Sequence, residues 1–485
     1  EIGVRLVGSE MCIRDRIGGL MNKYDIIFLG GGQAGVFGAY EAITKNPDLK
    51  VLVIDKGKML KNRVCPKELT GKCANCPTCA IIYGVSGAGA FSDSKFNMDY
   101  KVGGDVHKVT GKEVVNETIK DVVQIYRDFG FTEEPAGLKY NQAMIEIKRK
   151  CIENRVQLID TPTMHLGTDG SRKLYTKLVD FLLEKGVEFK VERDIEDLII
   201  EDGKIKGAKV TYRGQEEEYY SDNVLLAMGR SGAQKVMEMC HKSGVRCSNG
   251  AIDVGVRVEI PDIIMKEINE NFYEAKMIYY SKTYKDKMRT FCSNPSGFIA
   301  MEKHADDVVL ANGHAYKHKK SQNTNLALLC TKTFTEPFDK PFEYATAIAK
   351  MSSMLTGGKL LVQSYADLKE GKRSTDEKLE RLNIVPTTSD YVAGDISLAC
   401  PKRILDNIIE FIEAHDKITP GFASADLLLY FPEIKFRSTR MDIDKNMMTN
   451  IDGLYAAGDG SGYGSGLNIA AVMGILAVRH MLTRI

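Results

Sequence analysis

The feature that most constrains this chain is a glycine-rich turn that follows an apolar strand near its start. Residues 24–29 (YDIIFL) run directly into Gly30-x-Gly32-x-x-Gly35, and a helical segment follows. In this pattern the first glycine permits a tight turn, the second lets the backbone approach a pyrophosphate, and the third allows close helix–strand packing. The free N–H groups at the helix start then face the phosphates. The turn therefore predicts a dinucleotide-binding βαβ unit.

A second apolar strand supports this prediction. Residues 51–54 (VLVI) end at Asp55, 20 residues after Gly35. An acid at this position accepts hydrogen bonds from an adenosine ribose with a free 2′-hydroxyl, as in FAD or NAD, and disfavours NADP. A glycine-rich turn without a nucleotide is the plainer alternative, and the full context disfavours it. We also expect cofactor contacts from the neighbouring residues Gln33, Ala34 and Lys56.

The C-terminal part of the chain carries matching signals. Residues 453–459 (GLYAAGD) read as a strand that ends at Gly458 and Asp459, and a helix of small residues follows Gly466-Leu467-Asn468. One large ligand held by both ends of the chain explains this pairing, which is how many flavoproteins hold FAD. Residues 223–229 (NVLLAMG) form a further strand whose end, at Ala227 and Gly229, is a second expected cofactor contact. Taken alone, this last segment reads equally well as an ordinary buried strand.

The cysteines are unevenly distributed. Four of the eleven fall within fifteen residues, as Cys65-Pro66 followed by Cys73-x-x-Cys76-x-x-Cys79. Such short spacings bring thiolates close enough to share a metal or a cluster. Three readings stay open for this loop: an iron–sulfur cluster, a structural zinc, or a reduced or redox-active thiol group. We expect the scattered cysteines to be core residues: Cys151, Cys240, Cys247, Cys292, Cys330 and Cys400.

A run of small residues follows the cysteine loop. Residues 84–97 read GVSGAGAFSDSKFN. Small residues at this density let a flat aromatic ligand lie against backbone. A flexible linker is the plainer alternative, but the ending Phe-Ser-Asp does not suit one. The expected flavin contacts are Gly87, Gly89, Ala90, Phe91 and Ser92.

Composition limits the class of protein. The net charge of +1 gives no reason to expect nucleic acid or an anionic membrane surface as a partner. No run of 18 apolar residues is present, which argues against a transmembrane helix. Eleven cysteines without a secretory signal indicate a reducing compartment, and we expect a cytoplasmic protein. Residues 1–20 precede Met21 and resemble a translated adapter, so we expect a non-native extension there.

The pattern of strands and helices predicts an α/β fold with two parts. We expect a Rossmann-like FAD-binding domain in residues 21–232, with the cysteine-rich loop at 65–79, and its return in residues 441–485. Residues 233–440 would form an inserted mixed α+β substrate domain. Within it, residues 251–259 alternate like a strand running from edge to core, and helices are expected around 342–355 and 404–412.

Three residues of the inserted part are candidates for chemistry. Arg289 suits a substrate carboxylate, Cys292 a proton donor or redox thiol, and His314 an acid or base because histidine titrates near neutrality. Each has a plainer reading as a paired arginine, a buried cysteine or a hydrogen-bonded core histidine.

Together these motifs resemble the two-dinucleotide-binding-domain flavoproteins of the glutathione reductase superfamily. More narrowly, the cysteine loop, the 87–93 loop and residues 289–292 (RTFC) resemble a group of uncharacterised FAD-dependent dehydrogenases or oxidoreductases with a dedicated C-terminal domain. The resemblance implies that Asp459 binds the ribitol, that Ile195 lies near the adenine, and that the helix start after Asn468 faces the flavin. The chain departs from the group at Ser86 and Ser94, where glycine is usual, which puts the backbone conformation there in question.

Two hypotheses about function follow. The first is an FAD-dependent oxidoreductase that moves a hydride or an electron pair between a small organic substrate and the flavin. A ferredoxin-like partner feeding a cluster, or NAD(P)H, would supply electrons. The second is a flavin- or metal-containing redox sensor or assembly protein that turns over no small substrate. A plain NAD dehydrogenase is less suitable because it leaves Gly458 and Asp459 unexplained.

Overall fold

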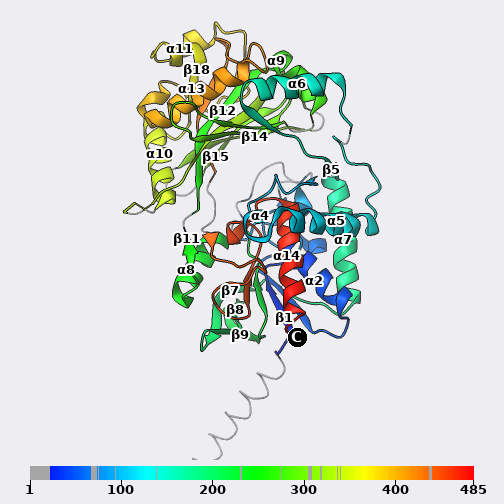
Figure 1. The fold of residues 1–485 in the computed structure, drawn as a ribbon. Coiled ribbons are helices and arrows are strands. Elements are labelled where there is room, and N and C mark those ends of the chain that lie inside the picture. Colours follow the sequence, from blue (N-terminus) through cyan, green and yellow to red (C-terminus); the bar gives the residue numbers. More distant parts are fainter. Residues whose placement is uncertain are drawn as a thin grey trace, which may run out of the picture. The chain divides into compact units, whose positions relative to one another are not determined.

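The computed structural model describes residues 22–66, 74, 76–92, 94–137, 139–229, 232–248, 250–272, 275–303, 308–316, 319–335, 337–338, 340–435 and 440–485 (Figure 1). The described residues form two compact units. Unit 1 takes those within Glu1–Ala136, Thr161–Ser248 and Ser438–Ile485, and unit 2 takes those within Gly137–Asp160 and Asn249–Arg437. Unit 2 thus includes residues 137–160, which the sequence analysis assigns to the first domain. The expected extension at residues 1–20 lies outside the described residues.

Unit 1 contains the following elements: β1 (Ile26–Leu29), α2 (Gln33–Lys45), β2 (Val51–Asp55), η1 (Leu60–Asn62), η2 (Ala88–Phe91), β3 (Lys95–Asn97), α4 (His107–Thr110), α5 (Lys112–Asp128), β5 (Thr163–His165), α7 (Gly167–Glu184), β6 (Glu188–Val191), β7 (Asp194–Glu201), β8 (Lys204–Tyr212), β9 (Gln215–Tyr220), β10 (Val224–Leu226), α8 (Ala233–Ser243), β11 (Cys247–Ser248), β21 (Arg440–Met441), β22 (Leu454–Ala456), η5 (Asp459–Ser461) and α14 (Leu467–Met481).

A five-stranded parallel sheet is the centre of unit 1. Its order is β22-β10-β1-β2-β6, so the strand before the glycine turn lies in the middle and the C-terminal strand lies at one edge. One face is covered by α2, α5, α7 and α14 and the other by α8 and the antiparallel β7-β8-β9 sheet. Helices α2 and α14 lie side by side (Figure 1) and pack closely, because a Cβ at Gly474 would stand 2.1 Å from the carbonyl oxygen of Ala34. The predicted Rossmann-like α/β domain is confirmed.

Unit 2 contains the following elements: α6 (Gln142–Glu153), β4 (Val156–Ile159), β12 (Ile252–Pro261), α9 (Asp262–Asn271), β13 (Lys276–Tyr280), β14 (Lys287–Asn294), β15 (Phe298–Lys303), β16 (Val309–His314), β17 (Asn323–Lys332), α10 (Pro341–Thr356), β18 (Leu360–Ser364), α11 (Tyr365–Lys369), α12 (Asp376–Leu379), β19 (Tyr391–Ala393), η4 (Ile396–Leu398), α13 (Lys402–Asp416) and β20 (Leu428–Lys435). The helices expected around 342–355 and 404–412 are present as α10 and α13.

An eight-stranded mixed sheet is the centre of unit 2. Its order is β19-β18-β20-β12-β17-β14-β13-β4, and only the β18–β19 pair is parallel among the described strands. Helices α9, α10 and α13 pack on its apolar face. The expectation of a strand running from edge to core at 251–259 is wrong, because β12 lies between β17 and β20 and every residue from Ile252 to Ile260 is buried. The charged side chains of β12 lie on the other face of the sheet, where buried partners stabilise them.

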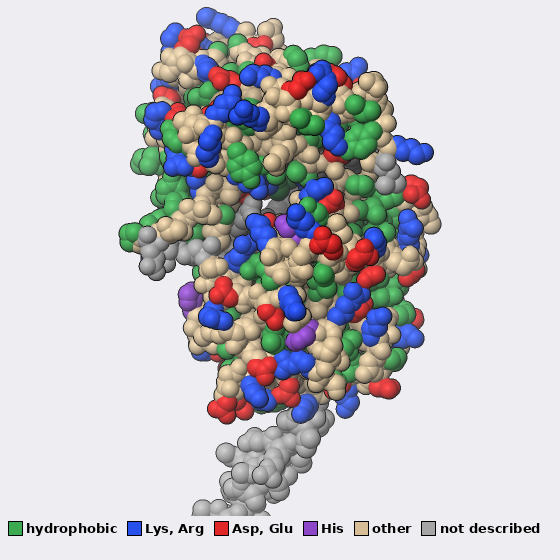
Figure 2. Space-filling view, viewed as in Figure 1, with side chains coloured by type: hydrophobic (Ala, Val, Ile, Leu, Met, Phe, Trp, Pro, Cys, Tyr) green, Lys and Arg blue, Asp and Glu red, His purple; other side chains and the backbone are tan. Residues whose placement is uncertain are grey.

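The described surface is mixed in charge. On the face drawn in Figure 2, basic and acidic side chains are interspersed over both units, in keeping with the net charge of +1. Within the described residues, no helix combines the length and the apolar character that a membrane crossing requires.

Candidate functional site

The residues predicted to bind a cofactor gather at one edge of the parallel sheet of unit 1. Strands β1, β2, β10 and β22 are parallel neighbours, so the segments that follow them lie at the same edge. The backbone connects them directly: the N–H of Gly30 donates to Ile54 (2.8 Å), that of Ala227 to Leu29 (2.9 Å), and that of Ala457 to Leu226 (2.9 Å). In open α/β sheets this carboxyl edge is where ligands bind.

The three glycines of the first turn have different surroundings. A Cβ at Gly30, whose φ is +121°, would lie 2.5 Å from the carbonyl oxygen of Ala227, and one at Gly35 would lie 2.1 Å from that of Gly30. A Cβ at Gly32 would meet no protein atom within 4 Å. Gly30 and Gly35 are therefore required by the packing of the chain itself, whereas Gly32 faces open space. No side chain caps the start of α2 at Gly32, which leaves its first N–H groups available to an anion.

Asp55 is held rigidly at the end of β2. Its two carboxylate oxygens accept hydrogen bonds from the N–H groups of Gly31 and Gly57, each at 2.8 Å. Burial raises the pKa of Asp55, while these two N–H groups and the charge of Arg63 oppose the rise. The N–H of Gly84 also acts on this carboxylate. Because a carboxylate offers about four acceptor sites, one remains for a ribose hydroxyl, as the prediction requires.

An open cavity of about 560 Å³ adjoins the residues that follow Asp55. Its lining includes Lys56, Gly57, Tyr83, Asp194 and Arg213. This volume lies within the usual range of small-molecule sites. Lys56 forms an ion pair with Asp194 at 2.7 Å. The side chain of Ile195, which the resemblance places near adenine, is buried in the core beneath the β7-β8-β9 sheet.

The 84–92 loop docks against the start of α2. A Cβ at Gly87 would stand 3.2 Å from Cα of Gly32. The Gln33 amide donates to the carbonyl of Ser86 at 3.1 Å and accepts from the hydroxyl of Tyr175 at 3.0 Å. A Cβ at Gly89 would lie 2.8 Å from the Leu467 side chain at the start of α14. The loop that was expected to contact flavin, with Ala90 buried and Phe91 and Ser92 half-buried, thus lies beside both helix starts.

Two serines of this loop take the conformation that favours glycine. Ser86 has φ +70° and Ser94 has φ +46°. Such angles cost an L-residue about 1–2 kcal/mol. The Ser94 hydroxyl recovers part of this cost by donating to the carbonyl of Gly89 at 2.9 Å. The departures from the group pattern therefore preserve the left-handed backbone.

The C-terminal segment meets the first turn. Gly458 has φ +74°, and a Cβ there would lie 3.7 Å from the Ala34 side chain and 3.8 Å from that of Ala470. Asp459 begins η5 and is half-buried. The Asn468 side chain donates to the carbonyls of Asn97 (2.8 Å) and Val102 (3.2 Å), and no side chain caps α14 at Gly466. Both ends of the chain therefore lie at the same edge of the sheet of unit 1; that they hold one ligand there stays a prediction.

Arg63 is a structural residue that the sequence analysis missed. Its guanidinium is buried and donates to the carbonyls of Ala80 (2.9 Å), Ile81 (2.9 Å), Val85 (2.7 Å) and Gly87 (2.8 Å). Burial lowers its pKa to about 10. A single arginine beside a cysteine motif gives no sequence signal for this role. The interaction fixes the segment between the cysteines and the 84–92 loop.

The described cysteines of the predicted ligand set are free thiols. Cys65 is buried, Cys76 is exposed and Cys79 is intermediate. Cys73 lies outside the described residues, so the geometry of the full set of four stays a prediction. Among the residues that are described, no group of three or more His, Cys, Asp or Glu side chains is arranged to hold a metal ion.

The three catalytic candidates lie in unit 2, each with its own neighbours. The guanidinium of Arg289 pairs with Asp253 at 2.7 Å and stands 4.7 Å from the ring centre of Phe291, while its buried Nε has no hydrogen-bond partner among the described residues. Cys292 has φ +43° and is half-buried. His314, at the end of β16, stacks on Phe298 with ring centres 6.1 Å apart. The contacts described for the three side chains therefore involve different partners.

A buried polar network on the sheet of unit 2 was also missed. Arg257, on β12, forms a bidentate pair with Glu433 on β20 at 2.7 and 2.9 Å, and both side chains are fully buried. Its remaining nitrogen donates to the side chain of Asn325 at 2.8 Å. Two positions further along β12, Glu259 accepts from the Tyr430 hydroxyl at 2.7 Å. Three charged residues on alternate positions of 252–260, Asp253, Arg257 and Glu259, with Gly255 between them, were the available signal for a buried polar face.

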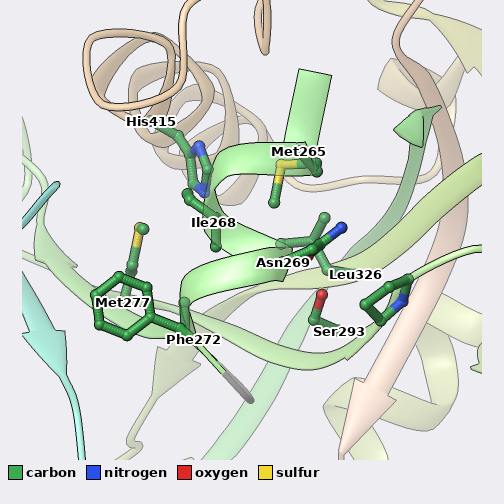
Figure 3. Close-up of a pocket in the computed structure, with 10 residues that line it drawn as sticks. Met265, Ile268, Asn269, Phe272, Met277, Ser293, Leu326 and His415 are labelled. Atoms are coloured by element: carbon green, nitrogen blue, oxygen red, sulfur yellow. The ribbon is translucent and has the colours of Figure 1, made fainter. Parts of the chain in front are cut away.

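Unit 2 also has a small enclosed cavity beneath α9 and α13 (Figure 3). Its volume of about 10 Å³ is the space of roughly one water molecule, which excludes an organic substrate. His415 on its wall stacks on Phe422 at 3.9 Å, and burial lowers its pKa to about 4. The cavity is a packing defect beside a neutral core histidine.

Comparison with known proteins supports an FAD-dependent protein. Residues 251–435 match the sequence model of a family described as FAD-dependent protein, C-terminal domain-like. A protein of Clostridium beijerinckii, described as uncharacterized, is 24% identical over 482 residues, which cover 94% of this chain and 80% of the relative.

Solved structures with a related arrangement include several flavoenzymes. The formate oxidase of Aspergillus oryzae gives a TM-score of 0.46 at 10% identity, covering 96% of this chain and 98% of that one. The 3-ketosteroid-Δ4-(5α)-dehydrogenase of Rhodococcus jostii gives 0.44 at 13%, covering 95% and 96%. The quinol fumarate reductase of E. coli gives 0.44 at 13%, covering 95% and 70%. Likenesses at this level support no conclusion about reaction or substrate.

Proposed function

We propose that this chain is an FAD-dependent oxidoreductase that transfers a hydride or an electron pair between a small organic substrate and the flavin. The observation that carries the proposal is the convergence of four strand ends at one edge of the sheet in unit 1, where Gly32 faces open space; neither α2 nor α14 has a side-chain cap at its start. The family match at residues 251–435 supports the same cofactor. We further propose a glutathione reductase-like cofactor domain and a cytoplasmic location, as the sequence analysis expects.

The residues present fit FAD. Gly32 and the first N–H groups of α2 suit the pyrophosphate, because no Cβ or capping side chain blocks them. Asp55 suits the adenosine ribose, and the adjoining 560 Å³ cavity suits the rest of the adenosine. Asp459 would bind the ribitol, and the start of α14 would face the flavin ring. FAD supplies two-electron redox chemistry when bound, whereas the chain binds and orients it.

Arg289 is the residue that we propose for substrate recognition in unit 2. Asp253 holds one of its terminal nitrogens at 2.7 Å, which orients the guanidinium on the sheet, and its Nε makes no hydrogen bond within the described residues. Arginine offers a planar pair of donors that suits a carboxylate. We therefore propose that the substrate carries a carboxylate, with Cys292 or His314 as the proton-transfer group.

An iron–sulfur cluster held by Cys65, Cys73, Cys76 and Cys79 remains a second proposal, with zinc as its alternative. Free thiols at the three described positions support it. A ferredoxin-like protein or NAD(P)H would then donate electrons. Anaerobic purification followed by iron, sulfide and zinc analysis tests this proposal, and unchanged metal content in a Cys76→Ser variant would contradict it.

The function itself is tested by anaerobic reduction of the purified protein. We expect small carboxylic acids or their unsaturated counterparts to change the flavin absorption of the wild type. We expect Arg289→Met to retain the flavin and to raise KM for the same compound. A panel in which no compound changes the flavin absorption, while dithionite does, would favour a redox sensor over an enzyme.

A further inference from the structure

Two cysteines that the sequence analysis assigns to the core meet outside the cofactor site. Cys240 lies near the end of α8 and Cys247 begins β11. Gly244, with φ +68°, ends the helix in a left-handed turn, and the N–H of Val245 donates back to the carbonyl of Cys240 at 2.9 Å. This turn reverses the chain so that Cys247 returns toward Cys240.

The two thiols lie in a cluster of sulfur atoms. The Cys240 thiol stands 3.9 Å from Sδ of Met441, and it interacts with the Cys247 thiol closely enough to shift the pKa of both. Met441 pairs with Cys247 across β11 and β21, which fixes both sulfurs on the same small sheet. All three residues belong to unit 1.

The two thiols differ in access and in acidity. Cys240 is fully buried, whereas Cys247 is partly exposed. The interaction between the two thiols raises the pKa of Cys240 and lowers that of Cys247, and burial and the charge of Asp442 oppose this lowering. The partly exposed Cys247 is thus both the more accessible and the more acidic thiol, which is the arrangement of an attacking thiol with a resolving thiol behind it.

Another cysteine of the chain shows the contrast. Cys151 is 1% exposed, and burial alone raises its pKa to about 11. It has the properties of an inert core cysteine, in agreement with the sequence analysis. The Cys240–Cys247 pair differs from Cys151 because one of its thiols is partly exposed to solvent and has a second thiol beside it.

We propose that Cys240 and Cys247 form a redox-active dithiol that small-molecule disulfides oxidise to an intramolecular disulfide. The Cys247 thiolate attacks one sulfur of the small disulfide, which forms a mixed disulfide and releases one thiol. The Cys240 thiol then loses its proton and attacks the Cys247 sulfur, which releases the second thiol. Two electrons pass from the dithiol to the small disulfide, and the released thiols carry the protons.

The proposed bond has a structural consequence in unit 1. It would tie the end of α8 to the β11–β21 pair, and α8 also packs against η5, which begins at Asp459. The proposal does not depend on flavin chemistry, because the oxidant is a soluble disulfide. Reduced glutathione in excess would restore the dithiol.

The test uses the full-length protein as purified, incubated with oxidised glutathione, alkylated and digested with trypsin. Cleavage after Lys235, Lys242, Arg246 and Arg257 places the two cysteines on separate peptides, 236–242 and 247–257. We expect these peptides to appear joined by a disulfide and to separate after reduction. Recovery of both peptides fully alkylated would overturn the proposal.

Variants separate an ordered dithiol from random oxidation. In Cys240→Ala we expect Cys247 to accumulate as the glutathione mixed disulfide, and in Cys247→Ser we expect Cys240 to stay unmodified. A Cys151→Ser control should leave the yield of the joined peptide unchanged. Modification of Cys240 in the absence of Cys247, at the wild-type rate, would contradict the assigned order. The wild-type digest is decisive even if a variant folds poorly.

Discussion

The two central sheets of this protein use opposite solutions for their interiors. In unit 1 the strands β1, β2, β10 and β22 are buried and almost wholly apolar, and the polar chemistry is confined to the backbone and short side chains at one edge. In unit 2 one face of the sheet is apolar, and the other combines a smaller apolar cluster on β18 and β20 with buried charges, such as Arg257 with Glu433. In unit 1 the polar groups at the edge of the sheet remain available to the proposed ligand. In unit 2 the buried polar groups bond to one another.

This difference decides how each unit responds to substitution. Removing a partner from a buried ion pair leaves an unpaired charge in the interior. A change at Gly32, which faces open space, should affect the proposed ligand and leave the protein core intact, unlike a change at Gly30 or Gly35. We therefore expect the largest stability effects in unit 2 and the most selective binding effects in unit 1.

The largest effect is expected for Arg257→Ala. The substitution leaves Glu433 buried with Lys435 as its remaining ion-pair partner, at 3.0 Å, and we expect a loss of about 3–5 kcal/mol in the free energy of unfolding. Urea unfolding followed by circular dichroism measures this change. The double variant Arg257→Met, Glu433→Leu should lose less than the single variant, because it removes both fully buried charges and leaves only the partly exposed Lys435 without this partner.

A matched control uses an exposed arginine of the same unit. Arg149 pairs with Glu146 and Glu153 on the surface of α6. We expect Arg149→Ala to unfold within error of the wild type. If Arg257→Ala were equally mild, the contrast between the two sheets would fail.

A second effect concerns pH and His415. The pKa of this buried histidine is about 4, below its ordinary value, so the unfolded chain binds a proton that the folded chain does not. Stability is therefore lost as the pH falls from about 6.5 to about 4, by roughly 3 kcal/mol in all. We expect His415→Leu to lose less stability than the wild type over this window. Carboxylates such as Glu259, whose pKa is raised by burial, are present in both proteins and cancel in the comparison; identical pH profiles would contradict the assignment.

A third effect separates ligand from fold in unit 1. Gly32→Val places its side chain in space that the protein leaves open, so the fold should be retained while FAD binds about 10–100-fold more weakly, or about 1.4–2.7 kcal/mol. Flavin fluorescence titration of the apoprotein measures the affinity. Gly170→Ala, in α7, is the control with ordinary space around it and should bind FAD normally. Unchanged affinity in Gly32→Val would remove this residue from the site.

The smallest effect is expected at the two left-handed serines. Ser86→Gly relieves the strain of φ +70° without removing a side-chain hydrogen bond within the described residues, so we expect a gain of up to about 1 kcal/mol. Ser94→Gly also removes the bond to Gly89 and should gain less. Thermal unfolding of the two variants compares them, and a loss of stability in Ser86→Gly would show that its φ carries little strain.

These contrasts also explain what the sequence could predict. Gly30, Gly35 and Asp55 act through local geometry, so their spacing alone predicts a turn, a helix start and a ribose ligand. Gly458 could be predicted because it follows the end of a strand, as Gly30 does. Each of these signals lies within a few residues of the strand that positions it.

The missed features depend on contacts between distant parts of the sequence. Arg257 and Glu433 are 176 residues apart, and Cys240 and Met441 are 201 residues apart. Neither pair has a short motif, and each residue alone is consistent with an ordinary strand or core position. Only the strand order of unit 2 and the β11–β21 pairing bring them together. Long-range pairing of this kind cannot be read from one sequence.

The central claim is that the open edge of unit 1 holds FAD, and the most direct test is to identify and count the flavin in the purified chain. The protein is denatured, and the released cofactor is separated by chromatography and quantified against protein concentration. The account predicts FAD, at one molecule per chain, in the wild type and a marked deficit in folded Gly32→Val. A folded wild-type chain that releases FMN or a nicotinamide nucleotide, or that binds no added FAD, would contradict it.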